Sequence, residues 1–283
     1  MVNIPGRTSG ASVTLLTGSR CGGSSRRRFL LAVTTLPLML LSCGFDRRRL
    51  DGGSRLAKEP LEQGWLSVRP RQLDTAPAMP SGVHPLAVAG GRALLSIPNG
   101  YRPDRPSPLA VMLHGAGGSA EDGLALFRPL ADDAGLILLA PQSRGRTWDL
   151  LLDGYGPDVA LLDQALEHVL GHYAVDAGDI ALGGFSDGAS YALSLGALNG
   201  ELFRSVIAFS PGFWVQGKSR GMPAFFVTHG TGDQVLPVAS TSRRLVPQLE
   251  GAGYEVTYHE FEGGHVVPGD LAAEALMWFF GTG

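Results

Sequence analysis

Short runs of consecutive apolar residues alternate with longer segments from residue 86 onward. All but the last run lack alternation between apolar and polar positions, as expected for strands that are covered on both faces of a sheet. The last run does alternate and closes the set. We predict strands at 92–98, 108–113, 135–140, 179–184, 205–209, 223–228 and 256–261.

The segments between these runs carry helical spacing. The clearest stripe is formed by Val159, Leu162, Ala165, Leu166 and Val169, which recur three and four residues apart. Strands that alternate with helices predict an α/β fold with a doubly wound, mostly parallel sheet, whose ligand sites lie at the carboxyl ends of the strands. We predict helices at 120–134, 156–173, 189–198, 238–252 and 271–280.

Composition supports one sizeable domain and adds a distinct N-terminus. Hydrophobic residues make up 44 % of the 283 residues. The formal charge of −3 is uneven, because residues 1–42 hold five arginines and no acid, leaving 18 basic against 26 acidic side chains from residue 43 onward. A basic tip on an acidic body indicates a targeting segment rather than a surface for nucleic acid.

The basic tip has the layout of an export signal. Arginines in Ser25–Leu30 precede the apolar run 31–41, which is short for a transmembrane helix and contains Pro37. The arginine pattern resembles the bacterial twin-arginine signal, and Leu40-Leu41-Ser42-Cys43 resembles a lipoprotein box. We predict an export signal over 1–42 and a lipidated Cys43 that anchors the protein to the membrane in the bacterial cell envelope. The alternative is a buried hydrophobic helix.

Residues 43–85 are rich in Arg, Gly and Pro and show no sustained period. This composition is typical of a tether. The predicted organisation is therefore a signal over 1–42, a lipidated tether over 43–85 and a catalytic domain over 86–283.

The body offers little for thiol or metal chemistry. Both cysteines, Cys21 and Cys43, precede it, which excludes a disulfide or a thiol nucleophile there. His168 and His172 lie four residues apart on a predicted helix, but a metal would need a third ligand nearby. We interpret them as surface residues and expect neither a metal nor a cofactor.

Two serines stand in a Gly-x-Ser-x-Gly pentapeptide, and their contexts differ. Ser186, in 184–188, follows an apolar run and precedes a predicted helix. A nucleophile elbow requires this order of strand, sharp turn and helix. Ser219, in 217–221, lies in a polar loop before a strand. We therefore predict Ser186 as a nucleophile and interpret Ser219 as an ordinary loop serine.

A serine hydroxyl needs a base, and the base needs an acid that orients it. Asp233 follows the predicted strand 223–228 in a glycine-rich loop, although such an aspartate can also serve only the turn. Of the three later histidines, only His265 lies between the last strand and the last helix, as the order Ser, Asp, His requires. His229 precedes Asp233, and His259 falls inside a strand.

An oxyanion hole needs two backbone N–H donors. We predict that Asp187, which follows the nucleophile, supplies one, and that Ala116 in the glycine-rich loop 114–119 supplies the other. The alternative for this loop is phosphate binding, but no Lys-Ser or Lys-Thr pair follows as in a P-loop.

The body resembles the α/β-hydrolase superfamily, and most of all its carboxylesterase/phospholipase-type serine esterases and polyhydroxybutyrate-depolymerase-like relatives. The resemblance spans about residues 86–283 and implies the roles of nucleophile, acid and base for Ser186, Asp233 and His265. One departure is Asp187, where relatives often carry a neutral residue. A carboxylate beside the oxyanion hole would disfavour anionic substrates if it points inward. The resemblance is carried by His114–Ser119, Gly184–Gly188, Gly230–Asp233 and Gly263–His265.

No long insertion that could form a lid separates residues 209 and 223, so we expect an open site. Trp148 and Trp214 follow predicted strand ends and either wall a substrate pocket or pack on the core. The predicted function is hydrolysis of small carboxylic esters through an acyl-enzyme intermediate. The alternatives are a polyester depolymerase, a feruloyl-type esterase, a peptidase or amidase, and a surface lipoprotein that only binds.

Overall fold

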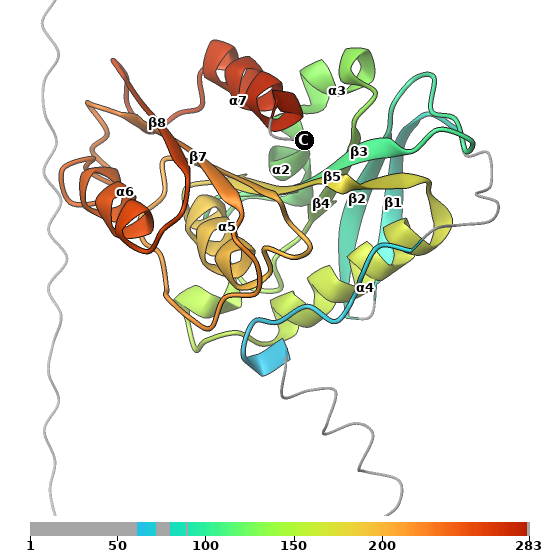
Figure 1. Ribbon diagram of the computed structural model, residues 1–283, viewed down its shortest axis with the longest axis horizontal. Helices are drawn as coiled ribbons and strands as arrows, with labels where there is room; N and C mark the ends of the chain where they lie inside the picture. The colour runs from blue at the N-terminus through green and yellow to red at the C-terminus, as the bar shows by residue number, and fades with distance from the viewer. Residues whose placement is uncertain (1–60, 72–79, 89, 282–283) are drawn as a thin grey trace, which may run out of the picture. The chain divides into compact units, whose positions relative to one another are not determined.

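Eight strands form one sheet in the order β1-β2-β4-β3-β5-β6-β7-β8 (Figure 1). The computed structural model describes residues 61–71, 80–88 and 90–281. The first two strands in this order pair antiparallel to their neighbours, and all the other pairs are parallel, which confirms the predicted fold class. The strands are β1 (Gly82–Val88), β2 (Gly91–Ile97), β3 (Ser107–Leu113), β4 (Ile137–Pro141), β5 (Val175–Phe185), β6 (Ser205–Phe209), β7 (Ala224–Gly230) and β8 (Val256–Phe261).

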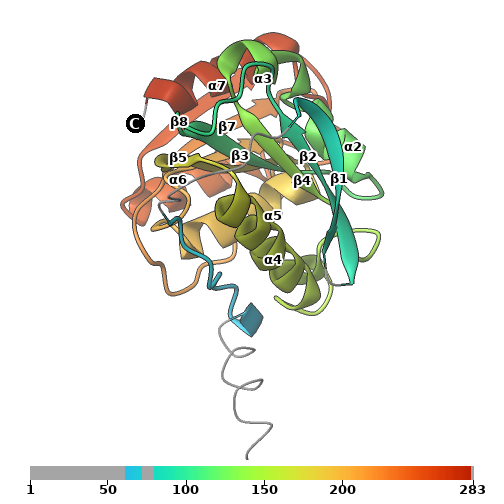
Figure 2. The same cartoon turned by 90° about the vertical axis from the view of Figure 1, so that its right-hand side faces the viewer.

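Helices cover both faces of the sheet (Figures 1 and 2). One face is covered by α4 (Pro157–His172), α5 (Asp187–Leu198) and α6 (Ser242–Gly251), whose apolar side chains share one buried cluster with the sheet. The other face is covered by α2 (Ala120–Ala125), α3 (Arg128–Ala134) and α7 (Gly269–Gly281), which share a second cluster. A short 3₁₀ helix, η2 (Asp149–Leu151), precedes α4.

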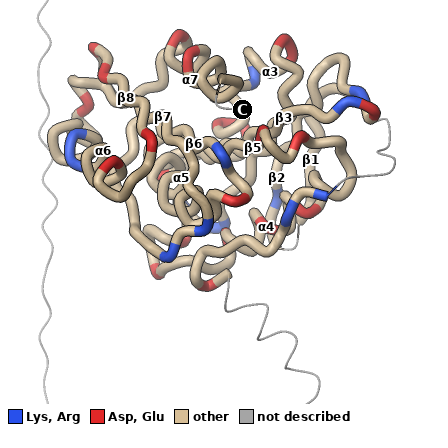
Figure 3. Tube along the Cα trace, viewed as in Figure 1, with Lys and Arg blue, Asp and Glu red and all other residues tan. Residues whose placement is uncertain are grey.

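Charge is excluded from the centre of this sandwich. Strands β3, β4 and β6 contain no charged residue and are almost completely buried. Burying an unpaired charge is costly, so most charged side chains lie on helices, loops and the outer parts of strands (Figure 3). The ends of the central strands, where loops begin, are therefore the places to look for functional groups.

Several predicted bounds differ from the observed ones, and two of the differences change the picture of the fold. The helix predicted over 120–134 is broken into α2 and α3, because Pro129 lies in the first turn of α3 and has no N–H to continue α2. The predicted start of the catalytic domain at residue 86 is wrong, because it lies inside β1. That strand pairs only with β2, and this edge position accommodates its Pro85 and its exposed residues.

Part of the predicted tether also belongs to the body. Leu66 is buried, and its N–H donates to the side chain of Asn199, which in turn donates to Gly64 O. The N–H groups of Ser67 and Val68 both donate to the carboxylate of Asp163. This clasp is built from buried polar partners that the sequence pattern does not show. The predicted signal and Cys43 lie outside the described residues.

In the part of the chain that the structure describes, no helix is both long enough and apolar enough to cross a membrane. The same residues contain no group of three or more His, Cys, Asp or Glu side chains arranged to hold a metal ion.

Candidate active site

Ser186 occupies the sharp turn between β5 and α5. Its backbone has φ of 57° and ψ of −119°, a left-handed conformation that is costly for a residue with a side chain. The flanking glycines make the turn possible. A Cβ on Gly184 would lie 2.6 Å from the carbonyl carbon of Gly188, and a Cβ on Gly188 would lie 2.4 Å from Leu113 O. The pentapeptide is therefore a steric requirement of this particular turn.

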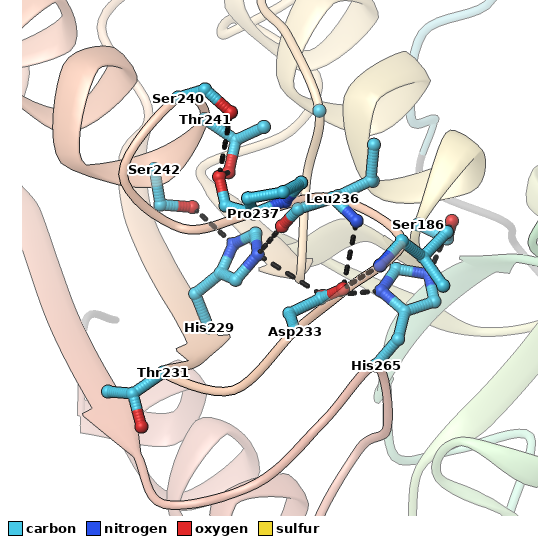
Figure 4. Close-up of polar contacts among 12 residues, drawn as sticks. Ser186, His229, Thr231, Asp233, Leu236, Pro237, Ser240, Thr241, Ser242 and His265 are labelled. Carbon is cyan, nitrogen blue, oxygen red and sulfur yellow. Dashed lines mark hydrogen bonds and ion pairs between the residues drawn. The ribbon is translucent and has the colours of Figure 1, made fainter.

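Three side chains from separate strand ends meet at this turn (Figure 4). His265 Nε2 lies 2.8 Å from Ser186 Oγ, and His265 Nδ1 lies 2.6 Å from Asp233 Oδ2. Because a carboxylate only accepts, Nδ1 carries the proton and donates to Asp233, which leaves the Nε2 lone pair facing the serine hydroxyl. The three predicted residues thus form one continuous hydrogen-bonded chain.

Asp233 is held as an anion by its surroundings. Its Oδ1 accepts hydrogen bonds from the N–H groups of Val235 and Leu236, both at 2.8 Å. Burial alone would raise the pKa of Asp233, but the hydrogen bonds from Leu236, His265 and Val235 outweigh it and hold the pKa below its usual range. A group that stays ionised can orient His265 and stabilise its protonated form.

The serine and histidines that the sequence disfavours make other contacts. Ser219 Oγ pairs with Tyr254 Oη at 2.6 Å, as expected for an ordinary loop serine. His259 lies 3.4 Å from Glu274 of α7. His229 is fully buried, and its Nε2 lies 3.3 Å from Asp233 Oδ2. The contact between His229 and Asp233 was not predicted, although both residues flank the same glycine turn at the end of β7.

The glycine-rich loop after β3 passes directly against the serine. A Cβ on Gly115 would lie 3.3 Å from Ser186 Cβ. Gly117 N–H donates to Arg146 O at 2.7 Å, and Ala116 is exposed. Within the described residues, no acceptor receives the N–H of Ala116 or of Asp187. Both predicted oxyanion donors therefore remain available beside Ser186.

Buried polar side chains fix this loop from behind. His114 Nδ1–H donates to Gly115 O at 2.7 Å, and its Nε2 accepts from Ser143 N–H at 3.1 Å. Burial lowers the pKa of His114, which is consistent with a neutral ring in these two roles. Trp148 Nε1–H donates to His114 O at 2.9 Å.

Both tryptophans pack against other aromatic side chains. Trp148 is fully buried and stacks on Tyr191 of α5 with ring centroids 5.2 Å apart. Trp214 is partly buried and meets Tyr254 edge-on at 6.0 Å. The prediction of a pocket role is wrong for Trp148, because its indole N–H is used to hold the loop, and Trp214 packs on the periphery of the core.

The carboxylate of Asp187 is tied to a neighbouring loop. Its Oδ2 accepts a hydrogen bond from Thr147 Oγ1 at 2.7 Å. Thr147 also lines a cavity of about 350 Å³ together with Leu152 and Tyr155, among others. The carboxylate that departs from the family pattern therefore has a hydroxyl partner next to a cavity.

Apolar side chains border the loops of the site. Val235 follows Asp233 and is 66 % exposed, and Val266 follows His265 and is 52 % exposed. Residues 210–223 form no helix, so no helical lid is inserted there. The rim of the site therefore offers apolar surface to an incoming molecule.

Comparisons with known proteins identify the family of the chain. Residues 159–275 match the phospholipase/carboxylesterase family. Feruloyl esterase C of Emericella nidulans is 30 % identical over 243 residues, which cover 72 % of this chain and 88 % of that protein.

Solved structures support the fold. The chain matches the CE1 ferulic acid esterase of the anaerobic fungus Anaeromyces mucronatus with a TM-score of 0.56 and 19 % identity, covering 76 % of this chain and 95 % of that one. Esterase PE8 matches with a TM-score of 0.55 and 24 % identity, covering 68 % and 98 %. The chain therefore belongs to the α/β-hydrolase esterases and is a carboxylic ester hydrolase.

Proposed function

We propose that this chain hydrolyses esters by a Ser-His-Asp mechanism with Ser186 as nucleophile, His265 as base and Asp233 as the acid. The observation that carries the proposal is the continuous chain of contacts, 2.8 Å from Ser186 Oγ to His265 Nε2 and 2.6 Å from His265 Nδ1 to Asp233 Oδ2. These distances are within the range for proton transfer to a general base.

The reaction proceeds in two steps. His265 Nε2 takes the hydroxyl proton as Ser186 Oγ attacks the ester carbonyl carbon, and the tetrahedral intermediate collapses when His265 returns that proton to the leaving alcohol. A water molecule then attacks the acyl-enzyme with His265 again as base, which releases the carboxylic acid and restores Ser186. Asp233 stays ionised throughout and stabilises the imidazolium.

The N–H groups of Ala116 and Asp187 are the proposed donors to the oxyanion. Their lack of a protein acceptor and the approach of Gly115 to Ser186 support this assignment. Preorganised donors contribute because they need no reorganisation when charge develops on the carbonyl oxygen.

Aromatic acyl esters of the feruloyl type are the proposed substrate class. Support comes from the two relatives whose names describe feruloyl or ferulic acid esterases and from the exposed apolar side chains of Val235 and Val266 beside the site. An apolar rim favours contact with the face of an aromatic ring.

Matched methyl esters test both parts of the proposal. We expect a higher kcat/KM for methyl ferulate than for methyl hexanoate, because the alcohol is the same and only the acyl group differs. Ser186→Ala should lower both rates by a factor on the order of a million, and Ser219→Ala should leave them unchanged. Hydrolysis that survives Ser186→Ala contradicts the mechanism, and preference for the hexanoate contradicts only the substrate class.

For location we propose export to the bacterial cell envelope with anchoring through lipidated Cys43. Support comes from the arginine pair and the apolar run before Leu40-Leu41-Ser42-Cys43. Cys43→Ala expressed in a bacterium should move the protein from the membrane fraction to the soluble fraction. Membrane retention of the Cys43→Ala variant contradicts the anchor.

A further inference from the structure

Asp233 has a second imidazole beside it, on the side away from His265 (Figure 4). His229 Nε2 lies 3.3 Å from Asp233 Oδ2, the same oxygen that accepts the His265 hydrogen bond. The side chains of His229 and Asp233 are completely buried. The mechanism proposed above does not use His229.

The hydrogen-bond partners of His229 define its protonation. Nε2 lies 2.7 Å from Leu236 O and near Asp233 Oδ2, and since both of these atoms only accept, Nε2 carries a proton. Nδ1 lies 2.7 Å from Ser242 Oγ, which has a proton to donate. Burial lowers the pKa of His229, so the ring is neutral with its proton on Nε2.

In this state His229 acts on both oxygens of the carboxylate. Its Nε2 lies 3.3 Å from Oδ2, so the positive end of the imidazole dipole is close to that oxygen. It also binds the carbonyl of Leu236, whose own N–H holds Oδ1 at 2.8 Å. Ser242 at the start of α6 fixes the ring so that it cannot turn away from either partner.

We propose that His229 is a positioning residue that fixes the Asp233 carboxylate for His265. The inference rests on the mechanism proposed for Ser186. Its chemical content is that the oxygen that accepts from His265 also lies beside the polar Nε2–H of His229, while the same N–H holds the Leu236 carbonyl, so that the carboxylate is fixed and its charge partly balanced before the reaction begins.

The sign of the effect on pH dependence follows from electrostatics. Without the Nε2–H of His229, the ionised form of Asp233 loses a nearby stabilising dipole and the fixed position of Leu236, and the pKa of Asp233 rises. The less balanced carboxylate also stabilises a protonated His265 more strongly, which disfavours the free base. Both effects move the acid limb of the kcat/KM profile to higher pH.

The other titratable groups near His229 and Asp233 are not substituted in any of the variants used below. On β8, Glu260 accepts both hydrogen bonds of the Arg243 guanidinium, which lowers the pKa of Glu260 to about 2, and it also accepts from Tyr258 Oη. At the start of α5, Asp187 accepts from Thr147. A shift of the acid limb therefore reports on Asp233 and His265.

Variants of His229 and its neighbour provide the test. His229→Leu removes the N–H at similar volume, and we expect kcat to fall about tenfold, the size of one buried hydrogen bond, with the acid limb of kcat/KM moved to higher pH. His229→Gln keeps a terminal N–H donor and should restore most of both properties. Thr228→Val, a buried change on the same strand at a hydroxyl without a hydrogen-bond partner among the described residues, should alter neither.

A purely structural role would lower kcat/KM by the same factor at every pH. An unshifted acid limb in His229→Leu, or the same shift in Thr228→Val, overturns the proposal. Fluorophosphonate labelling of Ser186 in the wild-type protein separates this outcome from failure of the mechanism itself, because labelling depends on Ser186 and His265 and not on the interpretation of the pH limb.

A measurement on the unmodified protein covers the case in which His229→Leu does not fold. In ¹⁵N-histidine NMR spectra, we expect His229 to remain a neutral Nε2–H tautomer through the pH range in which activity rises. An Nδ1–H tautomer, or a His229 that becomes protonated in that range, overturns the proposal.

Discussion

Ser186 and Ser219 stand in the same glycine-flanked pentapeptide, but their surroundings differ in every respect that matters for chemistry. The Ser186 hydroxyl faces an imidazole at 2.8 Å, and the Ser219 hydroxyl faces a tyrosine hydroxyl at 2.6 Å. Ser186 has a left-handed backbone at a strand–helix turn, whereas Ser219 lies in a loop without helix or strand. The comparison shows that a glycine of this pentapeptide is required where backbone atoms approach it so closely that a Cβ would collide with them.

The glycines themselves give the largest expected difference between the two regions. A Cβ on Gly188 would lie 2.4 Å from Leu113 O and 2.5 Å from His114 O, which are backbone atoms that cannot move aside. A Cβ on Gly217 would meet only the end of the flexible Leu198 side chain. In urea unfolding we expect Gly188→Ala to lower the free energy of unfolding by more than about 3 kcal/mol and Gly217→Ala by less than about 1 kcal/mol. Equal losses would contradict the comparison.

We expect an intermediate effect on kcat from removing the Thr147 hydroxyl, which binds the side chain of Asp187 at the proposed oxyanion hole. Thr147→Val is nearly isosteric and removes the 2.7 Å hydrogen bond to the Asp187 carboxylate. We expect kcat on methyl ferulate to fall about fivefold with little change in KM, which corresponds to about 1 kcal/mol of transition-state stabilisation.

Thr147→Ser keeps the hydroxyl and should restore the rate. Ser219→Ala also removes one hydroxyl hydrogen bond, the one to Tyr254, and should leave kcat unchanged. If Thr147→Val and Ser219→Ala had the same effect on kcat, the Asp187 contact would have no special role.

The smallest expected effect is on stability and concerns an ion pair on β8, the strand that follows Tyr254 and precedes His265 in the sequence. The Arg243 guanidinium lowers the pKa of Glu260 from 4.5 to about 2. Because the folded-state pKa lies below the unfolded one, this pair stabilises the fold above about pH 4.5, and its contribution disappears as the pH falls towards 2. The effect is small since the Arg243 side chain is 51 % exposed.

Glu260→Gln tests this sign. The difference in unfolding free energy between the wild type and Glu260→Gln should be constant at neutral pH and shrink between pH 4.5 and 2. A difference that stays the same down to pH 2 would contradict the assigned pKa shift.

The sequence predicts the parts of the fold that depend on continuous apolar runs. Strand β6 was predicted at its observed bounds because this central strand buries every residue, and the edge strand β8 was predicted at its bounds from its alternating pattern. The edge strand β1 was missed since it is half exposed and contains Pro85. The clasp formed by residues 66–68 was missed because its partners, Asn199 and Asp163, lie about a hundred residues away or more and carry no local pattern.

The same reasoning applies to the site. Ser186, Asp233 and His265 could be predicted because chain order and strand ends place them at one edge of the sheet. The buried role of Trp148 and the contact of His229 with Asp233 depend on how side chains turn within loops, and the spacing of residues does not encode it.

The central claim is that Ser186 is the only one of the two pentapeptide serines with an activated hydroxyl. The most direct test is to treat the wild-type protein with a fluorophosphonate and locate the adduct by peptide mass spectrometry. Activation by His265 predicts a single adduct on Ser186, none on Ser219, and loss of labelling in Ser186→Ala but not in Ser219→Ala. An adduct on Ser219, or labelling that persists in Ser186→Ala, would contradict the account.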